Sequence, residues 1–274
     1  MAVTLDSLLA CLDLHETRPG VWTGPQLQMD YRRIFGGQLL AQTVALGALT
    51  SPGKSVKSLS VSFPREGSLD GVLEFEVGQP MTGRTFATRT ISAAQEGKTF
   101  FVALVSMHDD TEEGLDYQID APDVAGPEEA KPEEVGMTPW EIRVVDGVDL
   151  SSRDQGPARY SFWTRVSERR LPDDAMVHQA LLSHATDLTV IGTALRPHAG
   201  YSQADTMVKL HTGVTTHQMW FHRPFRIDDW LLVDQHAPTT SGGRAFGLGH
   251  VFTRDGRLVA SFAQESLIRL IPQQ

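Results

Sequence analysis

The feature of this 274-residue sequence that most constrains its fold is a pattern of segments that occurs twice. In each copy, an apolar stretch of helical character precedes several short segments in which apolar and polar residues alternate. Such alternation is typical of half-buried β-strands. Phe63 and Phe221 lie in corresponding strands, 158 positions apart, and Gly97 and Gly256 lie in the last turns, 159 positions apart. A constant offset over several elements indicates an internal duplication.

The two copies predict the same elements in the same order. A helix is expected within residues 39–46 of the first copy and over residues 177–195 of the second, where no proline interrupts the apolar run. The strands follow one another through turns rather than through helices, which predicts antiparallel sheets and the α+β class. Strands are expected at residues 58–63, 73–77, 85–91 and 99–107, and again at residues 218–221, 230–233, 244–252 and 257–270.

The apolar character of both helices predicts how the sheets are arranged. A helix that is apolar over most of its circumference is usually buried on several sides. A sheet curled around such a helix is the hot-dog arrangement, and two copies paired edge to edge bury strand edges that one copy leaves open. We therefore predict a double hot-dog, with an N-terminal domain over residues 1–110 and a C-terminal domain over residues 140–274. Residues 111–139 are acidic and proline-rich, with Lys131 as their one basic residue, and are predicted to form a linker.

The charge and hydropathy of the chain exclude several classes of partner. The formal net charge of −10 leaves no basic surplus for binding the phosphate backbone of nucleic acids. No stretch reaches the roughly 18 uninterrupted apolar residues that span a bilayer. The first residues also lack the basic segment of a secretory signal. We predict a cytoplasmic protein that binds neither nucleic acid nor membrane.

Metal and cofactor sites are not predicted. Cys11 is the only cysteine, so neither an internal disulfide nor a cysteine metal cluster can form. His217 and His222 flank one strand, but their odd separation places them on opposite faces. The chain contains no phosphate-binding loop, no dinucleotide fingerprint and no Gly-x-Ser-x-Gly elbow.

Two polar residues in apolar surroundings are candidates for catalysis. Asp187 shares a helical stripe with His184 and Ile191, and a buried carboxylate is costly unless it is paired or hydrogen-bonded. It is either a functional group or a residue that caps a break in the helix or faces solvent. Gln264 shares a strand face with Phe262 and is either functional or a hydrogen-bonded amide of the core.

The chain resembles the acyl-CoA thioesterase II family of double hot-dog enzymes in a long series of motifs. The resemblance covers nearly the whole chain and is densest from Leu171 to the end. The matching segments are residues 33–38, 172–174 with 177–179, 185–188, 194–198, 219–225, 230–232, and 255–261 with 264–265.

The resemblance implies a set of catalytic residues with one departure. The family holds one water with an aspartate, a threonine or serine, and a glutamine, and Asp187 and Gln264 fall on the first and last of these. The hydroxyl position falls on Val214, which has no hydroxyl. We therefore assign this role to Thr215, with Thr216 as the alternative, because a β-bulge can re-aim one side chain. At the positions that correspond to Asp187 and Gln264, the first copy has the apolar residues Leu46 and Val105.

The implied function is hydrolysis of fatty acyl-CoA to a free fatty acid and CoA. Asp187 would act as general base, and a backbone N–H near Gly36 and Gly37 would stabilise the oxyanion. Two other functions on the same fold remain open: a non-catalytic acyl-CoA binding protein, suggested by Val214, and an acyl-thioester hydratase, suggested by His184 beside Asp187. A homo-oligomer, either a dimer or a tetramer, is also expected.

Overall fold

The computed structural model describes residues 3–29, 33–109 and 114–272. The helices and strands of the first half are α1 Leu5–Ala10, β1 His15–Arg18, β2 Val21–Thr23, α2 Gly36–Leu49, β3 Ser55–Ser62, β4 Glu74–Thr82, β5 Phe86–Gln95 and β6 Lys98–His108. Those of the second half are β7 Lys131–Glu133, β8 Glu141–Val144, β9 Arg159–Arg165, α3 Ala175–Thr186, α4 Val190–Leu195, β10 Leu210–Phe221, β11 Leu231–Ser241, β12 Arg244–Thr253 and β13 Leu258–Leu270.

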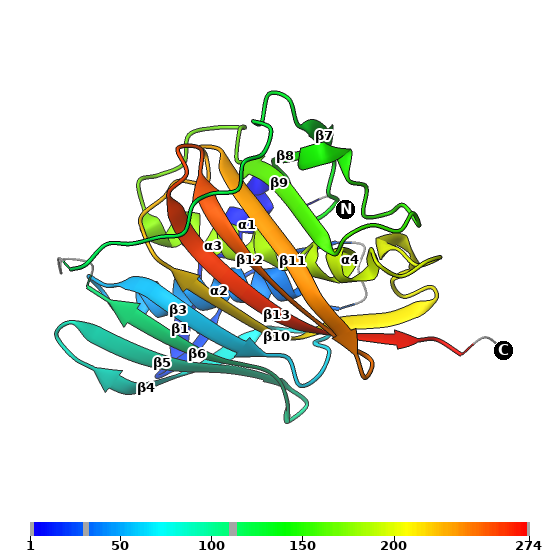
Figure 1. Ribbon diagram of the computed structural model, residues 1–274. Helices are drawn as coiled ribbons and strands as arrows, with labels where there is room; N and C mark the ends of the chain where they lie inside the picture. The colour runs from blue at the N-terminus through cyan, green and yellow to red at the C-terminus, as the bar shows by residue number, and fades with distance from the viewer. Residues whose placement is uncertain (1–2, 30–32, 110–113, 273–274) are drawn as a thin grey trace.

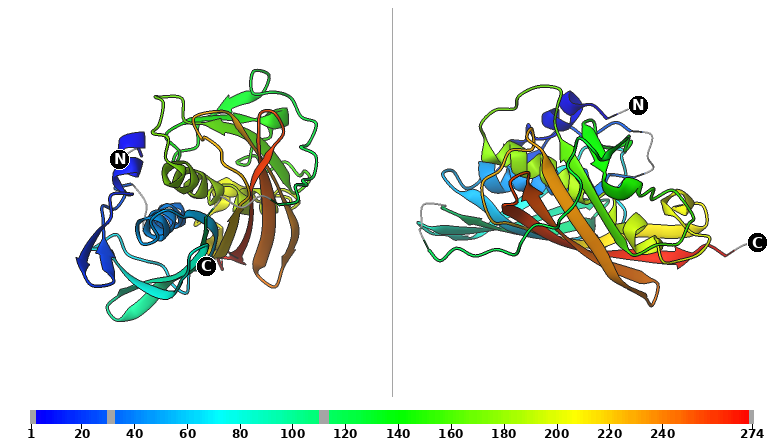
Figure 2. Two further views of the ribbon diagram at one scale, coloured as in Figure 1. Left: turned by 90° about the vertical axis from the view of Figure 1, so that its left-hand side faces the viewer. Right: turned by 45° about the horizontal axis from the view of Figure 1, so that its top comes forward.

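All of these strands belong to one sheet that curves around the two long helices (Figure 1). Its order is β1-β2-β4-β5-β6-β3-β10-β13-β12-β11-β9-β8-β7, so the two halves meet at β3 and β10. Each neighbouring pair is antiparallel, as the hairpin-linked strands predict. Figure 2 shows α2 and α3 lying side by side inside the curve of the sheet.

The junction between β3 and β10 has the geometry of a pseudo-twofold axis. Ser60 pairs with Gln218, and these two residues are related by the same 158-residue offset as Phe63 and Phe221. The next strands obey the same relation, because the rung that joins Leu59 to Val105 corresponds to the rung that joins His217 to Gln264. The structure therefore agrees with an internal duplication.

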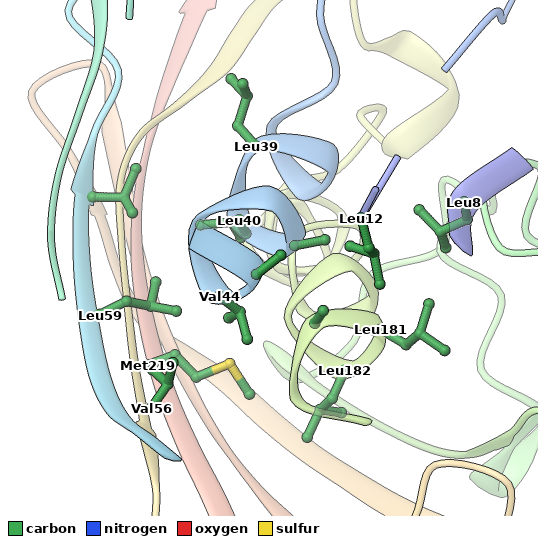
Figure 3. Packing of buried hydrophobic residues seen from close by; sticks show 14 of the residues in the cluster. Leu8, Leu12, Leu39, Leu40, Val44, Val56, Leu59, Leu181, Leu182 and Met219 are labelled. Atoms are coloured by element: carbon green, nitrogen blue, oxygen red, sulfur yellow. The ribbon is translucent and has the colours of Figure 1, made fainter. Parts of the chain in front are cut away.

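The core forms where α2 and α3 pack against each other and against the central strands (Figure 3). Leu40 and Val44 of α2 and Leu182 of α3 are completely buried, and Leu59 and Met219 cover them from the sheet. Burial of each such side chain contributes roughly 1.5–3 kcal/mol.

Two predicted segments differ from the structure. The helix expected over residues 177–195 is broken into α3 and α4, because Asp187 is the C-terminal cap of α3 and α4 begins only at Val190. The predicted linker also contains a strand, since β7 pairs with β8 at the edge of the sheet. The division into domains at residues 110 and 140 remains a prediction.

The close approach of the two helices requires a glycine at position 37. A Cβ placed on Gly37 would lie 2.7 Å from the backbone oxygen of His184 and 2.4 Å from the ring of Phe35. We expect Gly37→Ala to lower the free energy of unfolding by about 1–3 kcal/mol, because overpacking forces the helices apart. Urea unfolding measures this change. The control is Gly136→Ala, where a Cβ meets no atom within 4 Å, and an equal loss in both variants would contradict the packing argument.

Candidate active site

The carboxyl group of Asp187 lies where the C-terminal end of α3 meets the N-terminal end of α2. Only 7% of Asp187 is exposed, and its Oδ1 has no hydrogen-bond partner among the described residues. Its Oδ2 lies 2.6 Å from the place that a Cβ on Gly36 would occupy. A glycine at position 36 therefore leaves the space that the carboxyl group fills.

This burial changes the acidity of Asp187. Loss of hydration raises the pKa of the carboxyl to about 7, although the Gly37 backbone and the Arg33 guanidinium act in the opposite direction. A carboxyl with a pKa near neutrality is well matched to general-base catalysis, because it is partly ionised yet still basic. Structural ion pairs also shift pKa values, but no ion pair of Asp187 is present among the described residues.

Asp187 opens into a pocket of about 270 Å³ between the two halves of the chain. The first half contributes an apolar wall, and the second half contributes a wall that holds both polar and apolar residues. The apolar wall includes Ile34, Phe35, Leu39, Phe63 and Phe100, and the polar residues of the second half are Asp187, Gln203, Thr206 and Thr212. Arg33, Arg65 and Glu66 supply charged groups to the lining.

The wall of the pocket formed by the second half contains several polar atoms that lack hydrogen-bond partners among the described residues. The hydroxyl oxygens of Thr206 and Thr212 and the Oε1 of Gln203 are buried, without a hydrogen bond to any described residue. Thr212 is 1% exposed. Buried polar groups are nearly always hydrogen-bonded, so atoms of this kind in a pocket indicate a ligand or water that completes them. Our sequence analysis did not find these three residues.

The hydroxyl predicted at Thr215 does not face this pocket. A β-bulge does occur between Val214 and Thr216, where the sequence analysis invoked one. However, the Thr215 hydroxyl donates to the backbone oxygen of Glu265 at 3.0 Å, and Thr216 pairs with the same Glu265. Val214 lines the pocket, whereas Thr215 and Thr216 are not among its lining residues.

Gln264 lies in a buried chain of hydrogen bonds beside β10. It is 1% exposed, its Oε1 lies 3.1 Å from Nδ1 of His217, and its Nε2 donates to the Ser266 hydroxyl at 3.0 Å. The Nε2 of His217 lies 3.2 Å from the hydroxyl of Thr186, the residue before Asp187. Burial lowers the pKa of His217 to about 4, so its ring is neutral. Gln264 is thus linked to the helix end that carries Asp187, but it does not line the pocket itself.

His184, the second polar residue on the Asp187 stripe, has structural contacts. Its Nε2 lies 2.8 Å from the backbone oxygen of Met137, and its ring packs edge-on against Phe35 and Trp140. Burial lowers the pKa of His184 to about 4. His184 does not line the pocket.

The described residues contain no group of three or more histidine, cysteine, aspartate or glutamate side chains that could hold a metal ion. None of the helices in the described part of the chain is long and apolar enough to cross a membrane.

Solved structures share this architecture over nearly the whole chain. Acyl-CoA thioesterase II TesB2 from Mycobacterium marinum superposes with a TM-score of 0.82 at 30% sequence identity and covers 96% of this chain and 98% of its own. The tesB protein of Mycobacterium avium subs paratuberculosis superposes with a TM-score of 0.83 at 27% sequence identity. It covers 97% of this chain and 100% of its own. A hot-dog protein from Alicyclobacillus acidocaldarius, at 21% identity and a TM-score of 0.77, shows the same fold. The predicted α+β hot-dog fold is confirmed.

Sequence comparisons give the same result. The profile described as Acyl-CoA thioesterase matches residues 147–267, and the profile described as Acyl-CoA thioesterase N-terminal domain matches residues 26–108. Acyl-coenzyme A thioesterase 8 of Mus musculus is 31% identical over 88% of this chain and 82% of its own length. Acyl-CoA thioesterase 2 of Haemophilus influenzae is 27% identical over 98% of this chain and 99% of its own length. The chain therefore belongs to the acyl-CoA thioesterase family.

Proposed function

We propose that this protein hydrolyses fatty acyl-CoA thioesters to a fatty acid and CoA, with Asp187 as the general base. The observation that carries the proposal is the buried Asp187 carboxyl, whose Oδ1 has no partner among the described residues and whose pKa is raised to about 7 in a pocket between the two halves. Family membership supports the reaction type.

The chemistry follows from a water held at the carboxylate. Asp187 accepts a proton from this water while the water oxygen attacks the thioester carbonyl carbon. The negative charge that develops on the carbonyl oxygen is stabilised by a backbone N–H at the start of α2. Gly36 is the candidate donor, because the N–H groups of Gln38 and Leu39 donate to the Phe35 carbonyl oxygen and the Gly37 backbone contacts Asp187. The carbon–sulfur bond then breaks, and the proton passes from Asp187 to the departing sulfur. The products are the fatty acid and the CoA thiol.

The hydroxyl contact to the water, which the sequence assigns to Thr215, has two candidates. Thr215 remains a prediction from the sequence, and its hydroxyl is bonded to Glu265. The observed contacts favour Thr212, which precedes Val214 by two positions on the same inward face of β10 and carries a buried hydroxyl without a partner among the described residues. We therefore propose that Thr212 binds the water or the reacting thioester in place of the hydroxyl that Val214 lacks.

The hydratase alternative gains no specific support, because His184 lies outside the pocket lining and contacts Met137. The binding-protein alternative would require Asp187 to be inactive. The cytoplasmic location remains a prediction, and cell fractionation tests it.

The pH dependence of hydrolysis tests the base. Only the ionised carboxylate accepts a proton, so kcat/KM should rise with pH through about 7 and level off above it. Asp187→Asn should lower kcat by about 10²–10⁴-fold and remove that step from the profile. Thiol release from a panel of acyl-CoA chain lengths measures both effects. Asp13→Asn, an exposed carboxylate outside the pocket, is the control. Near-normal turnover in folded Asp187→Asn would refute the assignment.

Matched threonine variants separate the two hydroxyl candidates. Thr212→Val should reduce kcat by about tenfold or more, with a smaller change in KM, because a contact made in the transition state is lost. Thr215→Val should leave kcat within about twofold. The opposite result would assign the role to Thr215, and two unaffected variants would show that neither hydroxyl takes part.

We also propose that the chain assembles into a homo-oligomer, a dimer or a tetramer. The support is a group of exposed apolar side chains on alternate strands near the centre of the sheet: Val102 and Leu104 of β6, Trp220 of β10 and Phe246 of β12. Exposed apolar patches commonly mark interaction surfaces. Light scattering should give a mass of two or four times 30.1 kDa, and the monomer mass at micromolar concentration would contradict this.

A further inference from the structure

A second cleft lies at the opposite end of the α2–α3 pair from Asp187. It has a volume of about 590 Å³ and is formed by the start of β3, the N-terminal part of α3 and the segment after β10. The residues that matter for its chemistry are Val56, Lys57, Gln179, Phe221, Arg223 and Phe225.

This second cleft is the pseudo-twofold counterpart of the pocket at Asp187. The offset of 158 residues that relates β3 to β10 maps three lining residues of one site onto three of the other. The residue types are the same at all three positions: Phe63 and Phe221, Arg65 and Arg223, and Val56 and Val214. The duplication has therefore kept part of one binding surface in both places.

The groups proposed for hydrolysis are absent from the second cleft. Asp187 is the C-terminal cap of α3, and the C-terminal cap of α2 is Thr50, which follows the apolar turn from Leu46 to Leu49 and carries no carboxylate. Val105 occupies the rung that corresponds to Gln264. A thioester bound in this cleft would meet no carboxylate at the corresponding position.

A buried amide in the second cleft lacks a partner. Gln179 is 8% exposed, and its Nε2 donates to the backbone oxygen of Val56 at 2.9 Å. Its Oε1 is buried and has no hydrogen bond to any described residue. This oxygen can only accept, so an N–H or O–H donor from a ligand or a water completes it.

The rim of the second cleft carries positive charge on a chain with a net charge of −10. Lys57 forms no ion pair among the described residues, and its ammonium group lies 5.2 Å from the ring centre of Phe86. Arg223 is mostly buried, donates to the backbone oxygen of Leu258 at 2.9 Å and pairs with Asp116. Asp116 is largely exposed, so this one carboxylate partner is readily exchanged for another anion.

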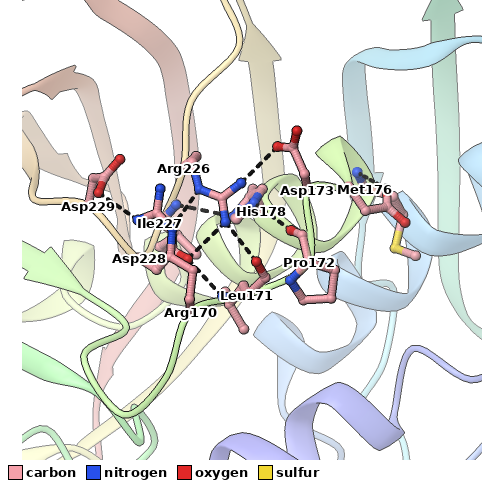
Figure 4. Close-up of polar contacts among 11 residues, drawn as sticks. Arg170, Leu171, Pro172, Asp173, Met176, His178, Arg226, Ile227, Asp228 and Asp229 are labelled. Atoms are coloured by element: carbon pink, nitrogen blue, oxygen red, sulfur yellow. Dashed lines mark hydrogen bonds and ion pairs between the residues drawn. The ribbon is translucent and has the colours of Figure 1, made fainter.

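Arg226 is held in a tighter network (Figure 4). It contacts Asp173, Asp228 and the backbone oxygen of Leu171, so its charge is already compensated. Lys57 and Arg223 are therefore the cations available to an anionic ligand.

We propose that the second cleft is a non-hydrolytic binding site for coenzyme A or its thioesters. The phosphate groups of the ligand contact Lys57 and Arg223, and a pantetheine amide donates to Oε1 of Gln179. The pantetheine chain of the ligand lies against Phe221 and Phe225. Each polypeptide then binds two molecules of this ligand class, one at a hydrolytic site and one at a site that senses substrate or product.

Calorimetric titration of the full chain with free CoA tests this proposal by counting sites. We expect two sites per chain in the wild type. Lys57→Glu and Gln179→Leu should each weaken one site by about tenfold or more, since each removes a charge-assisted or buried contact, and kcat/KM at low substrate should stay unchanged. Lys54→Glu, a lysine just before β3 that does not line the cleft, is the charge control.

Two results would overturn the proposal: a single CoA site per chain in the wild type, or two sites of unchanged affinity in both variants. The exposed Lys57 variant keeps the test decisive if Gln179→Leu proves unstable. Thiol release assayed on the same samples separates this outcome from a failure of the proposed hydrolysis.

Discussion

The structure depends on the contact between the N-terminal end of α2 and the C-terminal end of α3. Gly36 and Gly37 have no side chains, so the first turn of α2 approaches Asp187 and the backbone of His184 closely. This approach removes water from the Asp187 carboxyl and raises its pKa to about 7. The same contact that brings the two halves together therefore creates the proposed base, and the first-turn N–H groups of α2 lie beside it.

The pseudo-twofold relation gives this architecture two equivalent clefts with different chemistry. Equivalent positions hold the same residue types, Phe63 and Phe221 or Arg65 and Arg223, whereas the C-terminal cap is Asp187 in α3 and Thr50 in α2. A duplicated scaffold can keep a binding surface and lose the reactive group at one copy, because packing and catalysis impose separate requirements. Fold similarity alone would not reveal this asymmetry, since function depends on the residues of each site.

The sequence predicted the features that periodicity records. The alternation of apolar and polar residues predicted the antiparallel sheet, and the constant offset predicted the duplication. The match to family motifs identified Asp187 as the acidic residue of the site. The helix was predicted to be continuous over residues 177–195, because the apolar run continues through Leu188 into α4. A break capped by Asp187 was one of the alternatives, and the structure has this cap. Thr212 was not predicted as a candidate, because whether a hydroxyl has a hydrogen-bond partner depends on residues that are distant in the sequence. A bulge was anticipated near Thr215, but the direction of its hydroxyl depends on Glu265 of the neighbouring strand.

The central claim is that burial between the two helices makes Asp187 a base with a pKa near neutrality. Carbon-13 NMR of protein labelled at the aspartate carboxyls, titrated in the wild type and in Asp187→Asn, measures this directly. We expect one carboxyl resonance with a titration midpoint at about pH 7, and we expect it to be missing from the variant. A midpoint for Asp187 near 4, the ordinary value for an exposed aspartate, would contradict it.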